Sequence, residues 1–203
     1  HKSVLLNEVI ANMNIKADGI YVDATLGFGG HSSSILKEIK KGFLFAFDQD
    51  EEAISSSYER LSKSYDNFLI IKDNFVNMRK RLMEQNVSCV DGILFDLGVS
   101  SPQLDEAYRG FSYHNDARLD MRMDRNNKLS AYEVVNEYDE DDLARIIYNY
   151  GEEKYAKSIA RNIVKYRKNK NIETTLELVD IIKSSMPYKA MRDTHPAKRT
   201  FQA

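Results

Sequence analysis

The sequence predicts an α/β fold in which a doubly wound parallel sheet is followed by a segment made only of helices. Up to about Gly98, short apolar runs alternate with amphipathic helix patterns, which is typical of a parallel sheet covered on both faces. Beyond residue 128 only helix patterns remain. With 203 residues, 42% of them hydrophobic, the chain is long enough for one substantial core with a smaller subdomain.

The elements of the first half follow from these patterns in order. The chain opens on a helix pattern behind Ser3, whose apolar face carries Leu5, Leu6, Val9, Ile10 and Met13. Four apolar runs come next, and an amphipathic pattern separates each run from the following one. They predict strands over 19–25, 42–48, 67–73 and 91–98, with helices over 32–41, 50–64 and 75–86 between them.

The second half begins with a loop rich in Gly, Asp and Arg that runs from Gly98 to about residue 127. So long a loop usually has a function. A helix should start at "SAYE", residues 130–133, because Ser followed three residues later by Glu forms a capping box. Gly151 stands where a helix should end. Further helices are predicted over 152–169 and 174–186, the second ending before Pro187.

Charge divides the chain unevenly. Residues 151–203 hold 12 basic and 6 acidic residues, a net charge of +6, whereas the first 150 hold 17 and 25, a net charge of −8. The two halves are therefore expected to meet different partners. No run approaches the roughly 20 apolar residues of a membrane span, and the lone Cys89 cannot form an internal disulfide. We expect a cytoplasmic protein without a membrane partner, with Cys89 as a buried structural thiol.

The segment "VDATLGFGGHSSSIL", residues 22–36, places a glycine turn between a predicted strand and a predicted helix. Backbone N–H groups at such a turn commonly hold a nucleotide-like cofactor. The dinucleotide fingerprint fails because Ser32 stands at its last glycine position, which disfavours NAD. The spacing from Asp23 to Gly27 and Gly29 fits S-adenosylmethionine enzymes instead. Side chains are expected to be absent from the turn because the ligand approaches the backbone closely.

Three predicted strands end in an aspartate: Asp23, Asp48 and Asp96. The carboxyl ends of strands line the ligand crevice of an open α/β sheet, so these acids should converge on one edge. Asp48, about 20 residues beyond the glycines, is placed to accept both hydroxyl groups of a ribose. The alternative is that the acids only cap the helices that follow them.

Several longer motifs then resemble one family. "DATLGFGGHS", "FAFDQD", "DGILFDLGVSSPQLD", "RGFSY", "LDMRMD", "YGEEKYAKSIARNIV" and "HPAKRTFQA" resemble the bacterial ribosomal RNA small subunit methyltransferase H (MraW-like) family, whose members methylate N4 of a cytidine in 16S rRNA. The resemblance covers residues 1–203. It implies a Rossmann-like methyltransferase core that carries an inserted all-helical subdomain, and it implies that the last core strands are absent from this chain.

The resemblance also implies a domain organisation and a cofactor. Residues 1–104 would form the core that binds S-adenosylmethionine, 105–127 the active-site loop, 128–194 the helical insert, and 195–203 the return to the core. The amino-acid end of the cofactor would contact Gly29, Gly30 and His31, the last through its backbone. Asp48 would hold the ribose and Phe75 would lie beside the adenine. Asp96 and Gln103 would be the remaining cofactor-binding residues.

For the chemistry, the polar turn "DLGVSS" supplies Asp96 as the proton acceptor, with Ser100 close behind it. "RGFSY" and "LDMRMD" are available to close over the substrate base, with Asp120 and Arg122 as candidate contacts. The base would have to be single-stranded or flipped out of its stack. No covalent nucleophile is needed, and the spacing of the histidines predicts no metal site.

Basic residues suggest where RNA could bind. Arg161, Lys165 and Lys168 lie late in a predicted helix, where cations suit RNA phosphates but also complement the helix dipole. Tyr148, Tyr150 and Tyr155 are expected to pack in the core.

Three classes of function stay open at this point: a cytidine N4-methyltransferase acting on the small ribosomal subunit, a non-catalytic RNA-binding or assembly factor, and an NAD-dependent oxidoreductase. The oligomeric state, including a homodimer, is also left open.

Overall fold

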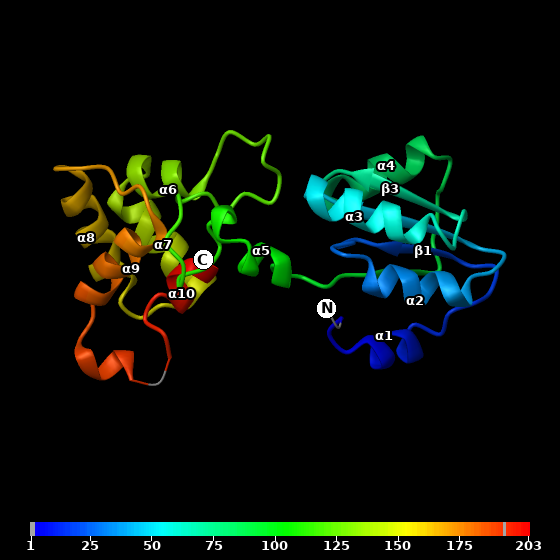
Figure 1. Ribbon diagram of the computed structural model, residues 1–203, viewed down its shortest axis with the longest axis horizontal. Coiled ribbons are helices and arrows are strands. Elements are labelled where there is room, and N and C mark those ends of the chain that lie inside the picture. The colour runs from blue at the N-terminus through cyan, green and yellow to red at the C-terminus, as the bar shows by residue number, and fades with distance from the viewer. Residues whose placement is uncertain (1–2, 193) are drawn as a thin grey trace. The chain divides into compact units, whose positions relative to one another are not determined.

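The computed structural model describes residues 3–192 and 194–203 (Figure 1). It divides into two compact units between Ser100 and Ser101. The first unit carries the sheet and the second is helical, so we describe each unit by itself.

The first unit is an α/β fold built on a parallel four-stranded sheet. Its strands are β1 (Ile20–Asp23), β2 (Phe43–Asp48), β3 (Phe68–Lys72) and β4 (Gly92–Leu94), in the order β3-β2-β1-β4. All three pairings are parallel, which confirms the predicted fold class. The four predicted strands are present, although β4 is shorter than its apolar run suggested, and it lies at the edge of the sheet.

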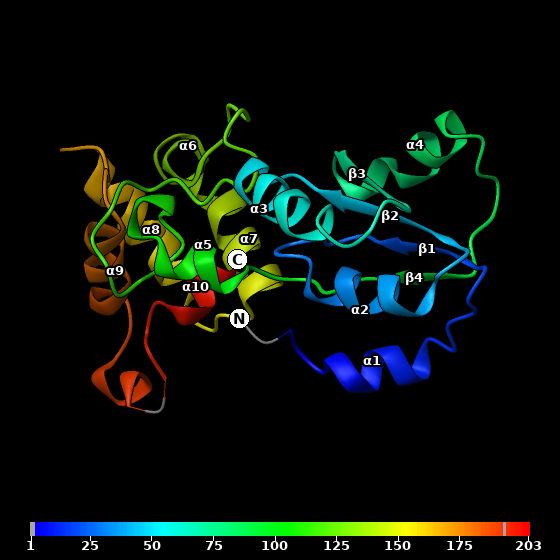
Figure 2. The ribbon, with the colours of Figure 1, turned by 45° about the vertical axis from the view of Figure 1, so that its right-hand side comes forward.

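Helices cover both faces of this sheet. They are α1 (Leu6–Asn12), α2 (Gly30–Glu38), α3 (Glu51–Leu61) and α4 (Met78–Glu84), the last preceded by the 3-10 turn η1 (Phe75–Asn77). Figures 1 and 2 show α2 and α4 on opposite sides of the sheet.

Two apolar clusters account for this arrangement. Because successive side chains of a strand point to opposite faces, Leu44 of β2 joins one cluster and Phe45 the other. The first cluster also takes Ile35 from α2 and Leu61 from α3, and the second takes Met78 from α4. The sheet is therefore doubly wound, as predicted.

The strand order creates a switch point. From β1 the chain builds outward to β2 and β3, and then returns to place β4 on the other side of β1. The connections leaving β1 and β4 thus diverge at the carboxyl ends of the two strands, which is where open α/β sheets bind ligands. Asp23 ends β1, and Asp96 follows β4 by two residues.

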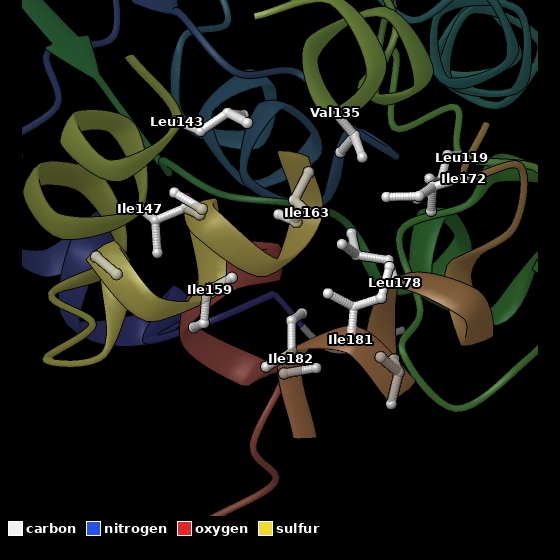
Figure 3. Close-up of a cluster of buried hydrophobic side chains, with 14 residues drawn as sticks. Leu119, Val135, Leu143, Ile147, Ile159, Ile163, Ile172, Leu178, Ile181 and Ile182 are labelled. Atoms are coloured by element: carbon white, nitrogen blue, oxygen red, sulfur yellow. The ribbon is translucent and has the colours of Figure 1, made fainter. Parts of the chain in front are cut away.

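The second unit is helical, as predicted. Its elements are α5 (Ser101–Asp105), η2 (Ala107–Arg109), α6 (Ala131–Glu137), α7 (Glu140–Gly151), α8 (Ala156–Arg167), α9 (Thr175–Ser184), η3 (Tyr188–Met191) and α10 (Lys198–Gln202). Ser130 and Glu133 form the predicted capping box of α6, and α7 ends at Gly151. Figure 3 shows the core, where Ile147, Ile159, Ile163 and Ile182 meet.

Several sequence expectations were wrong. The long loop is not wholly irregular, because α5 and η2 form within it. Tyr148 and Tyr150 are 63% and 64% exposed and do not pack in the core, since both lie on the solvent side of the amphipathic helix α7. Cys89 is exposed, because the chain between α4 and β4 runs over the surface. Within the described residues, every helix is too short or too polar to cross a membrane.

Candidate functional site

The glycine turn connects β1 to α2. Leu26 N–H donates to the Phe47 carbonyl over 2.8 Å, and Gly29 N–H donates back to the Leu26 carbonyl over 2.8 Å. Gly27 and Gly29 have φ values of +50° and +68°, a backbone region that glycine enters without steric cost. The turn delivers the chain to the first residue of α2, Gly30, where an α-helix has backbone N–H groups without intrahelical partners.

The structure identifies what excludes side chains from this turn. A Cβ atom on Gly29 would lie 3.0 Å from Nη2 of Arg60 and 3.2 Å from Oγ of Ser57, and one on Gly30 would overlap Oγ of Ser3. A Cβ on Gly27 would meet nothing closer than 3.9 Å. Backbone conformation therefore accounts for Gly27 and Gly29, with close protein atoms as a second reason at Gly29, and contact with Ser3 accounts for Gly30. The structure itself thus supplies reasons for these glycines, and close approach of a ligand to the turn stays a prediction.

Helix α3 holds the turn from the side. Ser57 Oγ donates to the Gly27 carbonyl over 2.8 Å, and the Arg60 guanidinium donates to the Phe28 carbonyl. Ser57 is fully buried. Sequence reasoning missed both residues, because a serine and an arginine three positions apart on an amphipathic helix are not distinguishable from ordinary surface positions.

Asp48, at the end of β2, ties the turn to the sheet. Its Oδ2 accepts a hydrogen bond from Gly27 N–H over 2.7 Å, and its Oδ1 accepts one from Asp50 N–H over 2.9 Å. Burial raises the pKa of the Asp48 carboxyl group, and these backbone hydrogen bonds offset the rise only in part. Each carboxylate oxygen has a second lone pair, so Asp48 retains capacity to accept hydroxyl groups of a ligand.

Asp23 has a different environment. Its side chain accepts hydrogen bonds from Ser32 Oγ over 2.7 Å and from Thr25 N–H over 3.1 Å, and the residue is only 1% exposed. Burial raises the pKa of Asp23, while Ser32, Thr25 and the nearby His31 act against the rise. Asp23 therefore supports the turn through Thr25 and Ser32, and it does not cap α2, whose N-cap, Gly29, makes no side-chain hydrogen bond.

Asp96 lies beside the same turn. Its N–H donates to Thr25 Oγ1 over 2.7 Å, and its Oδ2 lies 3.7 Å from Nδ1 of His31. The other ring nitrogen of His31, Nε2, lies 3.0 Å from the Val4 carbonyl. The carboxyl ends of β1, β2 and β4 thus meet at one edge. The His31 side chain takes part in that arrangement, which the expectation of a backbone role alone did not include.

Phe75 lies in η1 and packs edge-to-face on Phe95, with ring centroids 5.4 Å apart. The two rings are 37% and 48% exposed, so an apolar surface remains for a ligand to cover. Phe95 was missed by sequence analysis. The only feature of the sequence that could have indicated Phe95 is its position as an aromatic residue directly before Asp96, at the end of the apolar run that predicted β4.

The remaining candidate residues lie elsewhere along the chain. Ser100 is half-buried at the end of the first unit, and Gln103 is buried on α5 of the second. Asp120 and Arg122 pair with each other: Arg122 Nε donates to Oδ1 over 2.8 Å and Nη2 to Oδ2 over 2.7 Å. Although burial acts to raise it, the pKa of Asp120 is lowered by these bonds from Arg122.

Hydrogen bonds also fix the loop that carries this ion pair. Arg122 Nη1 donates to the Asn127 carbonyl over 2.8 Å, Met121 N–H to the Arg109 carbonyl over 3.0 Å, and Leu119 N–H to the Glu173 carbonyl over 3.0 Å. These bonds tie the loop to itself, to η2 and to the segment before α9.

These groups fit a nucleoside-type cofactor that also carries an amino acid. The turn and the start of α2 offer backbone donors, Asp48 offers a carboxylate for a diol, and Phe75 with Phe95 offers an aromatic surface for a base. Across the part of the chain that the structure describes, no group of three or more His, Cys, Asp or Glu side chains could hold a metal ion.

Comparison with known proteins gives consistent matches. The MraW methylase family matches residues 1–203. A protein of Exiguobacterium sibiricum named ribosomal RNA small subunit methyltransferase H is 58% identical over 204 residues, covering 100% of this chain and 65% of the relative. A protein of the same name from Clostridioides difficile is 56% identical and is covered to 66%. The chain thus spans slightly less than two thirds of the length of these curated relatives.

A solved rRNA methylase structure from Streptococcus thermophilus is 27% identical, with a TM-score of 0.34 over 37% of this chain and 41% of that chain. We draw no conclusion from so partial an overlap.

Proposed function

Because the chain belongs to the MraW methylase family, we propose that the protein transfers a methyl group from S-adenosylmethionine to N4 of a cytidine in 16S rRNA of the small ribosomal subunit. The observation that carries the proposal is the meeting of the glycine turn, Asp48 and Asp96 at the carboxyl ends of β1, β2 and β4. The same edge of an open α/β sheet is where a nucleoside ligand binds.

In this proposal the first unit holds most of the cofactor. Gly29, Gly30 and His31 bind its amino-acid end through the backbone at the start of α2, and Asp48 accepts the ribose hydroxyls. Phe75 packs on the adenine, with Phe95 behind it. Gln103 is proposed as a further cofactor contact. When bound, S-adenosylmethionine supplies an electrophilic methyl group on a positively charged sulfur.

Asp96 is proposed to accept the proton released in the reaction. A cytosine N4 amine is a poor nucleophile because its lone pair is delocalised into the ring, so the enzyme must orient it and remove a proton as the new bond forms. The Asp96 side chain is 45% exposed and its backbone is anchored to Thr25. A carboxylate so placed is fixed in position and still accessible to a substrate, and Ser100 lies close behind it in sequence.

Asp120 and Arg122 are proposed to contact the substrate base, but through a constrained geometry. Both oxygens of Asp120 already accept hydrogen bonds from Arg122. A base that binds here meets a preformed ion pair. It would contact the outer lone pairs of the Asp120 carboxylate and the outer N–H groups of the Arg122 guanidinium.

The second unit is proposed to bind rRNA through Arg161, Lys165 and Lys168 of α8 and its C-cap. Arg161 lies 3.8 Å from Glu140, a long surface pair that contributes little to stability. The neighbouring Arg167 has a structural role, because its Nη1 donates to the Val135 carbonyl over 2.7 Å. We therefore leave Arg167 out of the proposed RNA surface.

Two measurements test the function. Small-subunit rRNA from cells with and without the gene should differ, in mass mapping, by one methyl group on one cytidine. Calorimetry should detect binding of S-adenosylmethionine but not of NADH, which separates a methyltransferase from an oxidoreductase. Identical rRNA masses together with intact RNA binding would favour the non-catalytic assembly factor instead.

A further inference from the structure

His31 is a buried side chain whose two ring nitrogens have different partners. The residue is 6% exposed, with Nε2 at 3.0 Å from the Val4 carbonyl and Nδ1 at 3.7 Å from Asp96 Oδ2. A carbonyl oxygen only accepts hydrogen bonds, so Nε2 must carry a proton. In a neutral imidazole this leaves Nδ1 as the nitrogen with a free lone pair. That lone pair faces the Asp96 carboxylate.

A lone pair facing a carboxylate is unfavourable until a proton enters between them. Once Nδ1 is protonated, the ring donates to both Val4 and Asp96, and the imidazolium gains two acceptors. A second carboxylate, that of Asp23, also interacts electrostatically with His31 across the start of α2. The cation nearest to the turn from α3, Arg60, is engaged with the Phe28 carbonyl.

We propose that His31 is a positioning residue for methyl transfer: it orients the Asp96 carboxylate through Nδ1 and takes up the proton that Asp96 removes from the acceptor amine. This inference rests on the proposed function. The acceptor nitrogen uses its lone pair to bond the methyl carbon, and the carbon–sulfur electron pair stays with sulfur. The N–H electron pair remains on N4, and the proton passes to Asp96 and then to His31 Nδ1.

The charges near His31 favour its taking up the proton after methyl transfer and not before it. A positively charged cofactor bound near Asp96 would disfavour a proton on His31 before transfer. Transfer removes the charge from sulfur, so a proton on His31 then faces two carboxylates without a competing cation. The pair can therefore hold the proton after the step and release it to solvent through the exposed Asp96.

Two substitutions separate this role from a purely structural one. His31→Gln keeps an amide N–H near the Nε2 position, facing Val4, but cannot accept a proton. His31→Asn keeps a neutral donor near the Nδ1 position, facing Asp96, but loses the bond to Val4. Glu38→Gln, at the exposed far end of the same helix, is the control for loss of an ionisable group.

The full-length protein is assayed by single-turnover methyl transfer to small ribosomal subunits across a pH series, at saturating S-adenosylmethionine. His31→Gln should transfer at least about 10-fold more slowly than wild type and show an altered pH profile. Its affinity for S-adenosylmethionine and its melting temperature should stay near wild type. His31→Asn should lose both rate and thermal stability, and Glu38→Gln should match wild type.

A readout independent of activity comes from ¹⁵N NMR of the ring. Nε2 should carry the proton in the neutral ring, because it lies 3.0 Å from the Val4 carbonyl, and the Nδ1 resonance should change in Asp96→Asn. Wild-type rate and pH profile in His31→Gln would overturn this inference alone, as would a neutral ring protonated at Nδ1. A wild-type protein that transfers no methyl group at all would overturn the proposed function as well.

Discussion

The hydroxyl group of Ser57, on α3, donates a 2.8 Å hydrogen bond to the carbonyl of Gly27 in the glycine turn. One buried side chain of a neighbouring helix thus fixes the backbone that is proposed to bind the cofactor. Ser57→Ala removes this bond and leaves the Gly27 carbonyl without its partner. We expect affinity for S-adenosylmethionine to fall by about 5- to 10-fold, in line with the loss of about 1 kcal/mol for a buried hydrogen bond.

Calorimetry of the full-length protein measures this effect. The matched control is Ser56→Ala, which removes an exposed hydroxyl from the neighbouring position of the same helix. Equal affinities for the two variants would show that Ser57 does not shape the binding turn.

Asp48→Ala tests the proposed ribose contact. The substitution removes the carboxylate that would accept the ribose hydroxyls and that now accepts Gly27 N–H. Binding should weaken by about 1 to 3 kcal/mol, the scale of charge-assisted hydrogen bonds.

Binding of 5′-methylthioadenosine, which keeps the ribose but lacks the amino acid, gives a second reading of Asp48→Ala. A ribose contact predicts parallel losses for both ligands. An undiminished affinity for both would remove Asp48 from the binding site.

Asp23 gives a prediction for stability against pH. Burial raises the pKa of this carboxyl group above its ordinary value of 3.8, so the folded protein holds the proton more tightly than the unfolded chain does. The free energy of unfolding should therefore fall as the pH rises from 3.8 through the raised pKa, and it should stay lower above that range. Asp23→Asn keeps the shape and removes this loss, so its stability relative to wild type should increase with pH.

Urea unfolding at a series of pH values checks the sign. Asp91→Asn is the control of opposite sign, because hydrogen bonds from the Ile20 N–H and from Lys16 lower the pKa of Asp91. Its contribution to stability is present above 3.8 and is lost as the pH falls through the lowered pKa, so Asp91→Asn should lose stability relative to wild type as the pH rises. Asp23→Asn and Asp91→Asn curves with the same slope would contradict this assignment.

The sequence predicted which residues share one edge of the sheet, but it did not predict how the neighbouring helices pack on that edge. The positions of Asp48 and Asp96 at one edge followed from strand alternation, because parallel strands bring their carboxyl ends together whatever their side chains. The support from Ser57 and Arg60 could not be predicted, since it depends on how α3 is rotated and how closely it packs on the turn. The burial of Asp23 and the two partners of His31 depend on the same packing.

Exposure was the least predictable property. Tyr148 and Tyr150 were expected in the core, yet the apolar face of α7 is formed by Leu143 and Ile147 instead. The periodicity that predicts a helix does not by itself place amphipathic tyrosines, whose rings tolerate either environment.

Replacing Arg161, Lys165 and Lys168 together by glutamine tests the proposed RNA surface. Affinity for rRNA should fall, and its dependence on salt should flatten, because fewer counterions are released when fewer phosphates are neutralised. Binding of S-adenosylmethionine should not change. Filter binding at several salt concentrations measures the slope.

The charge-matched control is Lys37, Lys40 and Lys63, three exposed lysines of the first unit, also replaced by glutamine. Equal salt slopes for the two triple variants would return Arg161, Lys165 and Lys168 to the role of ordinary solvated charges.

The protein is proposed to methylate N4 of a cytidine, with Asp96 as the proton acceptor. The most direct test is a reaction of the full-length protein with small ribosomal subunits and S-adenosylmethionine bearing a deuterated methyl group, followed by mass spectrometric mapping of the rRNA. We predict the label on the exocyclic amine of one cytidine, and a loss of at least about 100-fold in single-turnover rate for Asp96→Asn. Label on a ring carbon or on another nucleotide would contradict the proposed reaction, and near-normal transfer by Asp96→Asn would contradict the proposed role of Asp96.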